Sequence, residues 1–431
     1  MSDEPEAALA DARARHLAGD LDQAERGYRA ILEEQPNHGE ALHLLGLLCQ
    51  QRGRHEQGAE LLGQAVAASP ATALYHCNLG VAWRSLGEID RSEACFRQAL
   101  ELDPQLAQGH YHLGGNCLAR HDHPAAEEEF RLAIEGAPQL KEAHYNLGIA
   151  LQRQDRRSEA MAAYGQALAI DPSYAKALLN LGNQLHRLQR WDEALSVYQR
   201  LASVDPTSAE AQHMTAALSG VTTPGCPPAY LRALFDDCAA TYDERLVVDL
   251  GYAAPRQLRE LICGASDSVP AFRRAVDLGC GTGLMGREIR PFCQHLVGVD
   301  LSPGMVAEAE RTGCYDALEV IDLVTHLHGG TEAYDLVVAA DVFSYWGDLT
   351  DGFEAVASRC TGGARFAFTT EAGTDEDVVL TRSGRYRHHR RAIAKLATRT
   401  GFTLVKDRAG AFRRERDEPV AGQLFLYEWG G

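Results

Sequence analysis

Several features that would mark a membrane or secreted protein are missing from this 431-residue sequence. It has no run of about 18 apolar residues, so no membrane-spanning helix is expected. The first residues, MSDEPEAALADARARH, are acidic and carry no apolar core, so no secretory signal is predicted. The 11 cysteines never form a C-x-x-C pair, which argues against a disulfide framework or a zinc ribbon. These absences predict a cytoplasmic protein with no metal site and no membrane contact.

Positive charge is also scarce. The formal net charge is -18, and of the 42 basic residues only Lys141, Lys176, Lys395 and Lys406 are lysine. Binding to nucleic acid is not expected, because phosphate contacts need dense lysine and arginine. The length and a hydrophobic content of 45% predict two or three globular domains.

The first half of the chain is periodic. Segment 144–172 predicts two short amphipathic helices that meet at a polar turn near Asp155, and Pro172 ends the second helix. Gly148 and Ala160 let the two helices approach closely. Glycine recurs at one constant spacing from Gly46 to Gly182. Proline keeps the same spacing, at Pro36, Pro70, Pro104, Pro138, Pro172 and Pro206.

This pattern resembles the tetratricopeptide repeat, whose period is about 34 residues with small, aromatic and proline positions in this order. The resemblance covers six units over about residues 5–206, and it implies an all-α solenoid. The first unit departs from the others, with Asp11 and Ala12 in place of Leu-Gly, as expected of a polar end cap. A helix over residues 207–218 is expected to close the other end, so the first domain is predicted to span 1–219.

Asparagine occupies one repeat position at Asn78, Asn146 and Asn180, and His112 interrupts the row. We call these three residues the asparagine ladder. An amide can donate to and accept from a peptide group, so the ladder predicts that the groove of the solenoid binds an extended peptide or a protein. The alternative is that these amides only cap hydrogen bonds within the repeats.

The pattern changes at residues 220–228, within the stretch SGVTTPGCPP, which we expect to be a linker. Short apolar runs then alternate with helical stretches, which predicts an α/β domain with a mostly parallel sheet over 229–431. The last two runs, FTLVKD and GQLFLYEW, have no helix between them and are expected to pair as an antiparallel hairpin.

The loop AVDLGCGTGLMG (275–286) allows two interpretations. Its GTGLMG matches the dinucleotide fingerprint G-x-G-x-x-G. In that reading Asp277, Gly279 and Cys280 would precede the first glycine, and a carboxylate would lie near a pyrophosphate of the same sign. A cofactor with an amino group and a sulfonium cation meets no such objection. Further acids follow the next runs, at Asp300, Asp322 and Asp341.

The second half resembles the class I S-adenosylmethionine-dependent methyltransferases, through this loop, VGVDLSPGM, EVIDL and the final hairpin. The resemblance implies a Rossmann-like fold that binds S-adenosyl-L-methionine, preceded by a helical lid over 229–262. The cofactor contacts it implies are Tyr242 in the lid, Asp277, Gly279, Cys280, Gly281 and Gly283 in the loop, Asp300, Leu301 and Met305 after the second strand, Asp322 and Leu323 near adenine, and Asp341.

The acceptor is less defined. After the fourth apolar run the chain reads AADVFSYWGD, without an Asn/Asp-Pro-Pro-aromatic motif, and Tyr345 and Trp346 are candidate pocket walls. Segment 381–416 holds 12 arginines or lysines, so it predicts an anion-binding surface that includes Arg385, or else a solvated helix face. His388, beside Tyr386, is a candidate general base, although methyl transfer does not always need one.

We therefore predict a methyltransferase whose repeats recruit a peptide or protein, which is a candidate acceptor. The alternatives are a small-molecule methyltransferase whose repeats serve oligomerisation or docking, an adaptor without activity, and an NAD-dependent dehydrogenase.

Overall fold

The computed structural model describes residues 3–236, 238–243, 246, 251–264, 271–373, 376–415 and 418–431. The chain divides into two compact units, Met1–Leu188 and Gln189–Gly431. In the part of the chain described, no helix is both long and apolar enough to cross a membrane.

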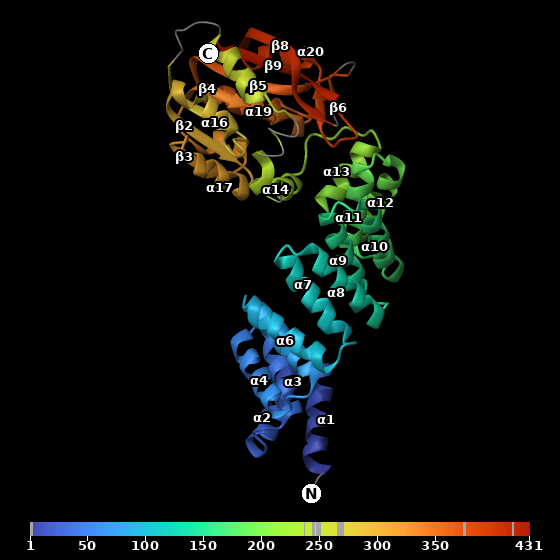
Figure 1. Cartoon of the computed structure of the whole chain (residues 1–431). Coiled ribbons are helices and arrows are strands. Elements are labelled where there is room, and N and C mark those ends of the chain that lie inside the picture. Colours follow the sequence, from blue (N-terminus) through green and yellow to red (C-terminus); the bar gives the residue numbers. More distant parts are fainter. Residues whose placement is uncertain are drawn as a thin grey trace. The chain divides into compact units, whose positions relative to one another are not determined.

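The first unit is entirely helical (Figure 1). Its elements are α1 (Asp3–Leu17), α2 (Leu21–Glu34), α3 (Gly39–Gln51), α4 (His55–Ala68), α5 (Ala73–Ser85), α6 (Ile89–Leu102), α7 (Ala107–Ala119), α8 (His123–Gly136), α9 (Lys141–Arg153), α10 (Arg157–Ile170) and α11 (Ala175–Arg187). Each helix packs on the next along the chain, as a solenoid requires. The predicted all-α repeat architecture is confirmed.

The turn between the two helices of each repeat has a fixed shape. Asp155, where the sequence predicts the turn, has a φ of 60° and lies between α9 and α10. A left-handed residue recurs there once in every repeat, and glycine, which tolerates that conformation best, fills only half of the positions. The six residues are Gly19, Gly53, Gly87, His121, Asp155 and Gln189.

The periodic glycines let paired helices touch. A Cβ built on Gly148 would lie 2.4 Å from Cε1 of Tyr164, and one on Gly80 would lie 2.6 Å from Cε1 of Phe96. Both aromatic rings are fully buried. The space beside each glycine is therefore filled by the aromatic ring of the second helix, and a larger residue in place of the glycine would displace that ring.

The proline positions are tied to the following helix by hydrogen bonds. Nε2 of His76 lies 2.8 Å from the carbonyl oxygen of Pro70, and His110 and His144 lie 3.0 Å from those of Pro104 and Pro138. These histidines occupy the same position in three successive repeats, and they give the carbonyl oxygens at the repeat junctions a partner.

The second unit begins within the repeat array, with α12 (Trp191–Val204) and α13 (Ala209–Leu218). The sequence placed the domain boundary at residue 219, whereas the compact units divide between Leu188 and Gln189. The difference arises because α13 packs on the α/β fold. Nε2 of His213 lies 2.8 Å from the carbonyl oxygen of Gly384, and Ala217 packs near Leu380.

The remaining helices and strands of the second unit form one α/β fold (Figure 1). The helices are α14 (Pro228–Asp236), η1 (Ala239–Thr241), α15 (Ala254–Cys263), α16 (Leu284–Ile289), η3 (Arg290–Phe292), α17 (Pro303–Thr312), α18 (Leu323–Gly329), η4 (Phe343–Tyr345), α19 (Thr350–Ser358) and α20 (Arg390–Arg399). The strands are β1 (Phe272–Leu278), β2 (Cys293–Asp300), β3 (Ala317–Val320), β4 (Tyr334–Ala339), β5 (Cys360–Ala372), β6 (Val378–Leu380), β7 (Tyr386–His388), β8 (Phe402–Glu415) and β9 (Glu418–Trp429).

The strands form a single sheet in the order β3-β2-β1-β4-β5-β7-β6, and β9 pairs with both β5 and β8. Strands β1 to β5 are parallel, and β8 and β9 are an antiparallel hairpin, as predicted. Two apolar clusters cover the faces of the sheet, one with α15 and α16, the other with α18, α19 and α20. Because β1 lies between β2 and β4, the strand order reverses there, which is where ligands bind in such folds.

Candidate functional site

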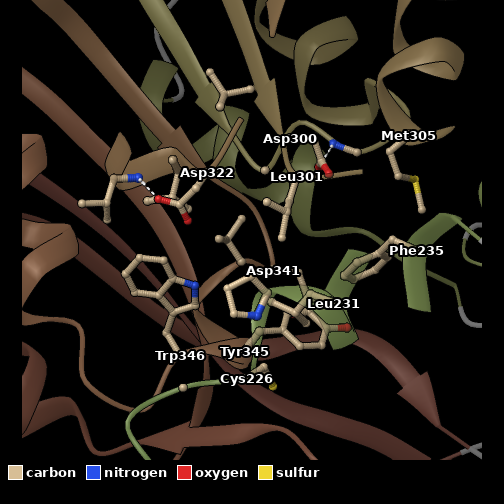
Figure 2. Close-up of a pocket in the computed structure, with 18 of the residues that line it drawn as sticks. Cys226, Leu231, Phe235, Asp300, Leu301, Met305, Asp322, Asp341, Tyr345 and Trp346 are labelled. Atoms are coloured by element: carbon tan, nitrogen blue, oxygen red, sulfur yellow. Dashed lines mark hydrogen bonds between the residues drawn. The ribbon is translucent and has the colours of Figure 1, made fainter. Parts of the chain in front are cut away.

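A cavity of about 560 Å³ opens at the carboxyl ends of β1, β2 and β4. This volume suits a nucleoside cofactor together with a small acceptor. Figure 2 shows Asp300 and Asp322 along one side of the pocket, with Tyr345 and Trp346 along the opposite side. Of the predicted site residues, those that line the cavity are Tyr242, Gly279, Gly281, Asp300, Leu301, Met305, Asp322, Leu323, Asp341, Tyr345 and Trp346.

The glycine turn after β1 forms the floor of the cavity. Gly279 has a φ of 69°, and a Cβ there would lie 2.5 Å from Cγ2 of Val342, so a side chain does not fit. Gly281 has a φ of 53° and faces open space in the cavity. A ligand can therefore approach the backbone at Gly281 closely.

Asp300 ends β2 and is held by backbone donors. The N–H of Gly281 donates to its Oδ2, and the N–H of Ser302 donates to its Oδ1, each at 2.9 Å. Burial raises the pKa of this carboxyl above its ordinary value, and the backbone donors oppose that rise. The carboxylate thus faces the cavity in a fixed orientation, which suits the two hydroxyls of a ribose.

Asp322 lines the cavity on the same side as Asp300 (Figure 2). It caps α18, because the N–H groups of Val324 and Thr325 both donate to its Oδ1 at 3.0 Å. Its neighbour Leu323 also lines the cavity, and Met305 lies on the side of Asp300. An apolar wall beside a capped carboxylate suits an aromatic base with an exocyclic amino group.

At the opposite end, Asp341 lies after β4 in a left-handed conformation, with a φ of 59°. Nη1 of Arg413 donates to both of its carboxylate oxygens at 2.9 Å, and Arg413 also pairs with Glu371. The side chain of Arg413 is 1% exposed. The Arg413–Asp341 contact keeps the strained turn in place, since backbone strain persists only where surrounding contacts hold it.

Family sequence models match both halves of the chain. A model described as "Methyltransferase domain" matches residues 276–366, and three described as "Tetratricopeptide repeat" match 8–73, 73–106 and 151–218. The chain joins tetratricopeptide repeats to a methyltransferase domain.

Individual relatives match shorter segments. Over 90 residues the chain is 38% identical to human methyltransferase-like protein 27, covering 21% of this chain and 36% of the relative. Over 83 residues it is 28% identical to nodulation protein S of Bradyrhizobium diazoefficiens, covering 19% and 40%. The chain thus spans two fifths or less of these relatives' lengths. The crystal structure of MamA is 26% identical, with a TM-score of 0.35, and the match covers 38% of this chain and 96% of MamA.

Three predicted cofactor residues of the methyltransferase domain do not line the cavity. Asp277 is fully buried, and the hydroxyl of Tyr315 donates to its Oδ2 at 2.7 Å. Cys280 is buried, and Gly283 begins α16 with a φ of 92°. These three residues support the glycine turn and do not line the cavity.

Tyr242 comes from the predicted lid, and it lines the cavity with Leu231 and Phe235 of α14. Residues 237, 244, 245 and 247–250 of that segment lie outside the described residues.

His388 and Tyr386, the candidate catalytic residues, do not line the cavity of the methyltransferase domain. Nε2 of His388 lies 2.7 Å from the carbonyl oxygen of Trp346 and 3.2 Å from that of Phe343, and burial lowers its pKa. The Tyr386 hydroxyl lies 2.6 Å from that of Thr223. The two side chains hold β7 to neighbouring segments, so the structure does not support the candidate catalytic roles of His388 and Tyr386.

The basic segment 381–416 is also neutralised more than the sequence suggests, and Arg416 lies outside the described residues. Nη1 of Arg385 lies 3.4 Å from Asp341 and 3.8 Å from Glu371, and its guanidinium covers the ring of Tyr345. Arg390 pairs with Asp407. Arg385 therefore lies behind the residues that line the cavity and does not line it itself.

Residues 224–228 line the cavity, although their glycine and prolines predicted a linker. The N–H of Cys226 donates to the carbonyl oxygen of Tyr345 at 2.9 Å, and the N–H of Gly347 donates to that of Pro224 at 2.8 Å. The segment is therefore paired with the loop after β4. Asp348, Asp351, Glu371 and Arg413 were also missed, because no local motif marks them.

The asparagine ladder lies in the first unit, and each amide contacts a ring of the preceding repeat. Nδ2 of Asn78 lies 2.7 Å from Nε2 of His43, and Nδ2 of Asn180 lies 3.2 Å from the hydroxyl of Tyr145. Asn146 interacts with Tyr111, which holds the corresponding position of the preceding repeat, and this interaction lowers the pKa of the tyrosine against the larger effect of burial. All three residues are half-buried, so each is partly open to solvent.

Proposed function

We propose that this chain transfers a methyl group from S-adenosylmethionine to an acceptor bound in the cavity. The observation that carries this proposal is the carboxylate of Asp300, which backbone N–H groups hold at the rim of a glycine-floored cavity. The matched methyltransferase domain, residues 276–366, contains this turn and this acid. This match favours methyl transfer over the hydride transfer of a dehydrogenase.

Each wall of the cavity would contact one part of the cofactor. Asp300 would accept from the ribose hydroxyls, and Asp322 with Leu323 would flank the adenine. The open backbone at Gly281 would face the methionine moiety, with Tyr242 covering it from the lid. When bound, S-adenosylmethionine supplies a methyl group activated by a sulfonium cation.

The residues at the acceptor end orient and enclose the reactants. Phe235, Tyr345 and Trp346 surround the space next to Asp341 with aromatic groups, which exclude water. Burial raises the pKa of Tyr345 to about 12, so its hydroxyl stays protonated at neutral pH and can donate a hydrogen bond. Catalysis would then rest mainly on alignment of the acceptor with the methyl group.

The direct test is cofactor binding by calorimetry. The unaltered protein is expected to bind S-adenosylmethionine and not NAD, and Asp300→Asn is expected to weaken binding about 10-fold to 100-fold. The reason is that an amide cannot accept from both ribose hydroxyls and from two backbone donors. Asp335→Asn, at the opposite end of the sheet, is the matched control. Preference for NAD, or unchanged affinity in Asp300→Asn, would refute the proposal.

We further propose that the repeats recruit a peptide or protein, and that this partner carries the methyl acceptor. Tetratricopeptide repeats commonly bind other proteins, and the amides of the half-buried Asn78, Asn146 and Asn180 keep hydrogen-bonding capacity for a peptide backbone. The alternative is that the repeats only dock or oligomerise a small-molecule enzyme, and in that case loss of the ladder amides leaves turnover of the acceptor unchanged.

A further inference from the structure

We propose that the acceptor is an aliphatic amine that is protonated in solution, an inference that rests on the proposed methyl transfer. The charged side chains among the described residues that line the cavity are all negative. Among the described residues, the lining contains no lysine, arginine or histidine. It contains five carboxylates, from Asp300, Asp322, Asp341, Asp348 and Asp351. A cleft lined by one sign of charge concentrates ligands of the opposite sign, so an anionic acceptor is disfavoured.

Three arginines behind the wall are directed toward carboxylates, and a fourth, Arg399, lies close enough to Asp348 to help lower the pKa of that carboxyl. Arg413 pairs with Asp341 and Glu371 and is almost fully buried. Arg385 pairs with the same two acids, and Arg387 lies 3.6 Å from Glu371. The negative charge of Asp341 is thereby balanced by Arg413 and Arg385, which lie behind the cavity lining. Asp348 and Asp351 remain as the carboxylates that can attract an acceptor.

Asp348 and Asp351 lie where the loop after β4 enters α19. The N–H of Thr350 donates to Oδ1 of Asp348 at 2.9 Å. The hydroxyl and the N–H of Thr350 hold the pKa of Asp348 below its ordinary value, so this carboxylate is ionised at neutral pH. Both side chains line the cavity and are exposed, so an ammonium group can reach them without losing all of its water.

An aromatic ring borders the same place. Trp346 lines the cavity next to Asp348, and α19 packs against it, with a Cβ on Gly352 falling 3.2 Å from its Cζ3. Tyr345, by contrast, already has the guanidinium of Arg385 over its ring, 5.0 Å from the centroid. Tryptophan is the aromatic side chain that attracts cations best, so an ammonium between Trp346 and the two carboxylates is favoured by both.

The reaction balances for such an acceptor. The ammonium first loses a proton to water. The nitrogen lone pair then forms a bond to the methyl carbon while the carbon–sulfur bond breaks, and its electron pair stays on sulfur as a thioether. An ammonium and a methylsulfonium thus give a methylated ammonium, a thioether and one released proton.

Three five-carbon probes that differ only in their end groups test the inference: 1,5-diaminopentane, 1,5-pentanediol and glutarate. Calorimetry with S-adenosylhomocysteine present measures binding without turnover. The diamine is expected to bind at least about 10-fold more tightly than the diol, and glutarate more weakly than either. Mass spectrometry with a labelled methyl donor is expected to place the label on nitrogen. A lysine peptide as a further probe shows whether the amine comes from protein or from a small molecule.

Asp348→Asn and Asp351→Asn together are expected to weaken diamine binding about fivefold or more, since each removes one exposed ion pair. Asparagine can still accept from the N–H of Thr350, so the turn that leads into α19 is kept. Glu354→Gln removes an exposed charge from α19 outside the cavity lining and is the matched control. Tighter binding of the diol or glutarate, or an equal loss in Glu354→Gln, would overturn the inference. Failure to bind S-adenosylhomocysteine would instead count against the proposed function.

Discussion

Two acids that look alike in the sequence have different surroundings in the structure. Asp277 and Asp300 each lie near the end of an apolar run, and the resemblance assigned both to the cofactor. Asp300 faces the cavity, whereas Asp277 lies beneath the glycine turn against Tyr315. Spacing along the chain indicates that a carboxylate follows a strand, but it does not tell whether the strand end is exposed or covered. The tyrosine that covers Asp277 comes 38 residues later.

The buried position of Asp277 predicts a pH effect on stability. Burial raises its pKa from 3.8 to about 7. The negative charge of Asp300 contributes to this rise, and the hydrogen bond from the Tyr315 hydroxyl reduces it. The folded state therefore keeps a proton that the unfolded state releases. The free energy of unfolding should fall as the pH rises from about 4 to about 7 and then level off. Asp277→Asn removes this group and is expected to be about 2 kcal/mol more stable than the unaltered protein at pH 8.

Urea unfolding of the second unit at pH 5 and pH 8 measures this difference. Tyr315→Phe is the companion variant, because losing the hydroxyl should raise the pKa of Asp277 further and extend the decline to higher pH. An Asp277→Asn protein with the same pH dependence as the unaltered one would contradict the assignment.

At the scale of helices and strands, the glycines of one repeat give a matched pair of predictions. Gly148 in α9 lies against Tyr164, whereas a Cβ on Gly165 in α10 meets nothing within 4 Å. Gly165→Ala is expected to stabilise the first unit by about 1 kcal/mol, because alanine favours the helix. Gly148→Ala gains the same propensity but must displace the ring, which costs about 1–3 kcal/mol, so a net loss is expected.

Thermal unfolding monitored by circular dichroism separates the two variants. Equal shifts in Tm for Gly148→Ala and Gly165→Ala would show that the close contact between α9 and α10 does not limit the size of this residue.

The elements that the sequence predicted well are those with a strong local period. The recurring glycines and prolines predicted α9 and α10 with their turn at Asp155. The alternation of apolar runs with helical stretches predicted β1 to β5, and the last two apolar runs predicted the final hairpin. Residues 224–228 were misread because glycine and proline there mimic a linker. Their partners are backbone groups of the loop after β4, more than a hundred residues away, and such pairing leaves no local pattern.

The short strands β6 and β7 were missed for a related reason. Segment 381–416 is dominated by arginine, and its charge suggested a surface rather than a strand. In the structure Tyr386 and His388 of β7 are buried while Arg387 between them is half-exposed, which is the alternation of a strand with one covered face. At least six of the twelve basic residues of the segment form ion pairs, and none of the described ones lines the acidic cavity. The anion-binding surface expected there stays a prediction.

At the scale of the whole molecule, the chain joins tetratricopeptide repeats to a methyltransferase domain. If the repeats recruit the acceptor, the two units contribute to different kinetic constants. A protein acceptor held by the repeats is presented at a raised effective concentration, which lowers its KM. A small amine that enters the cavity alone gains nothing from the repeats. The acceptor protein itself is found by incubating cell extract with the enzyme and a labelled methyl donor.

Asn146→Ala combined with Asn180→Ala tests this division. Losing two amides that grip a peptide is expected to raise KM for the labelled protein about 10-fold, at about 1 kcal/mol or less per hydrogen bond, and to leave kcat unchanged. Turnover of 1,5-diaminopentane and binding of S-adenosylmethionine should not change. The matched control is Tyr145→Phe, which removes the hydroxyl that Asn180 contacts but keeps the amide. If Tyr145→Phe raised KM as much as the double variant, the amides would act within the repeats, and the docking alternative would stand.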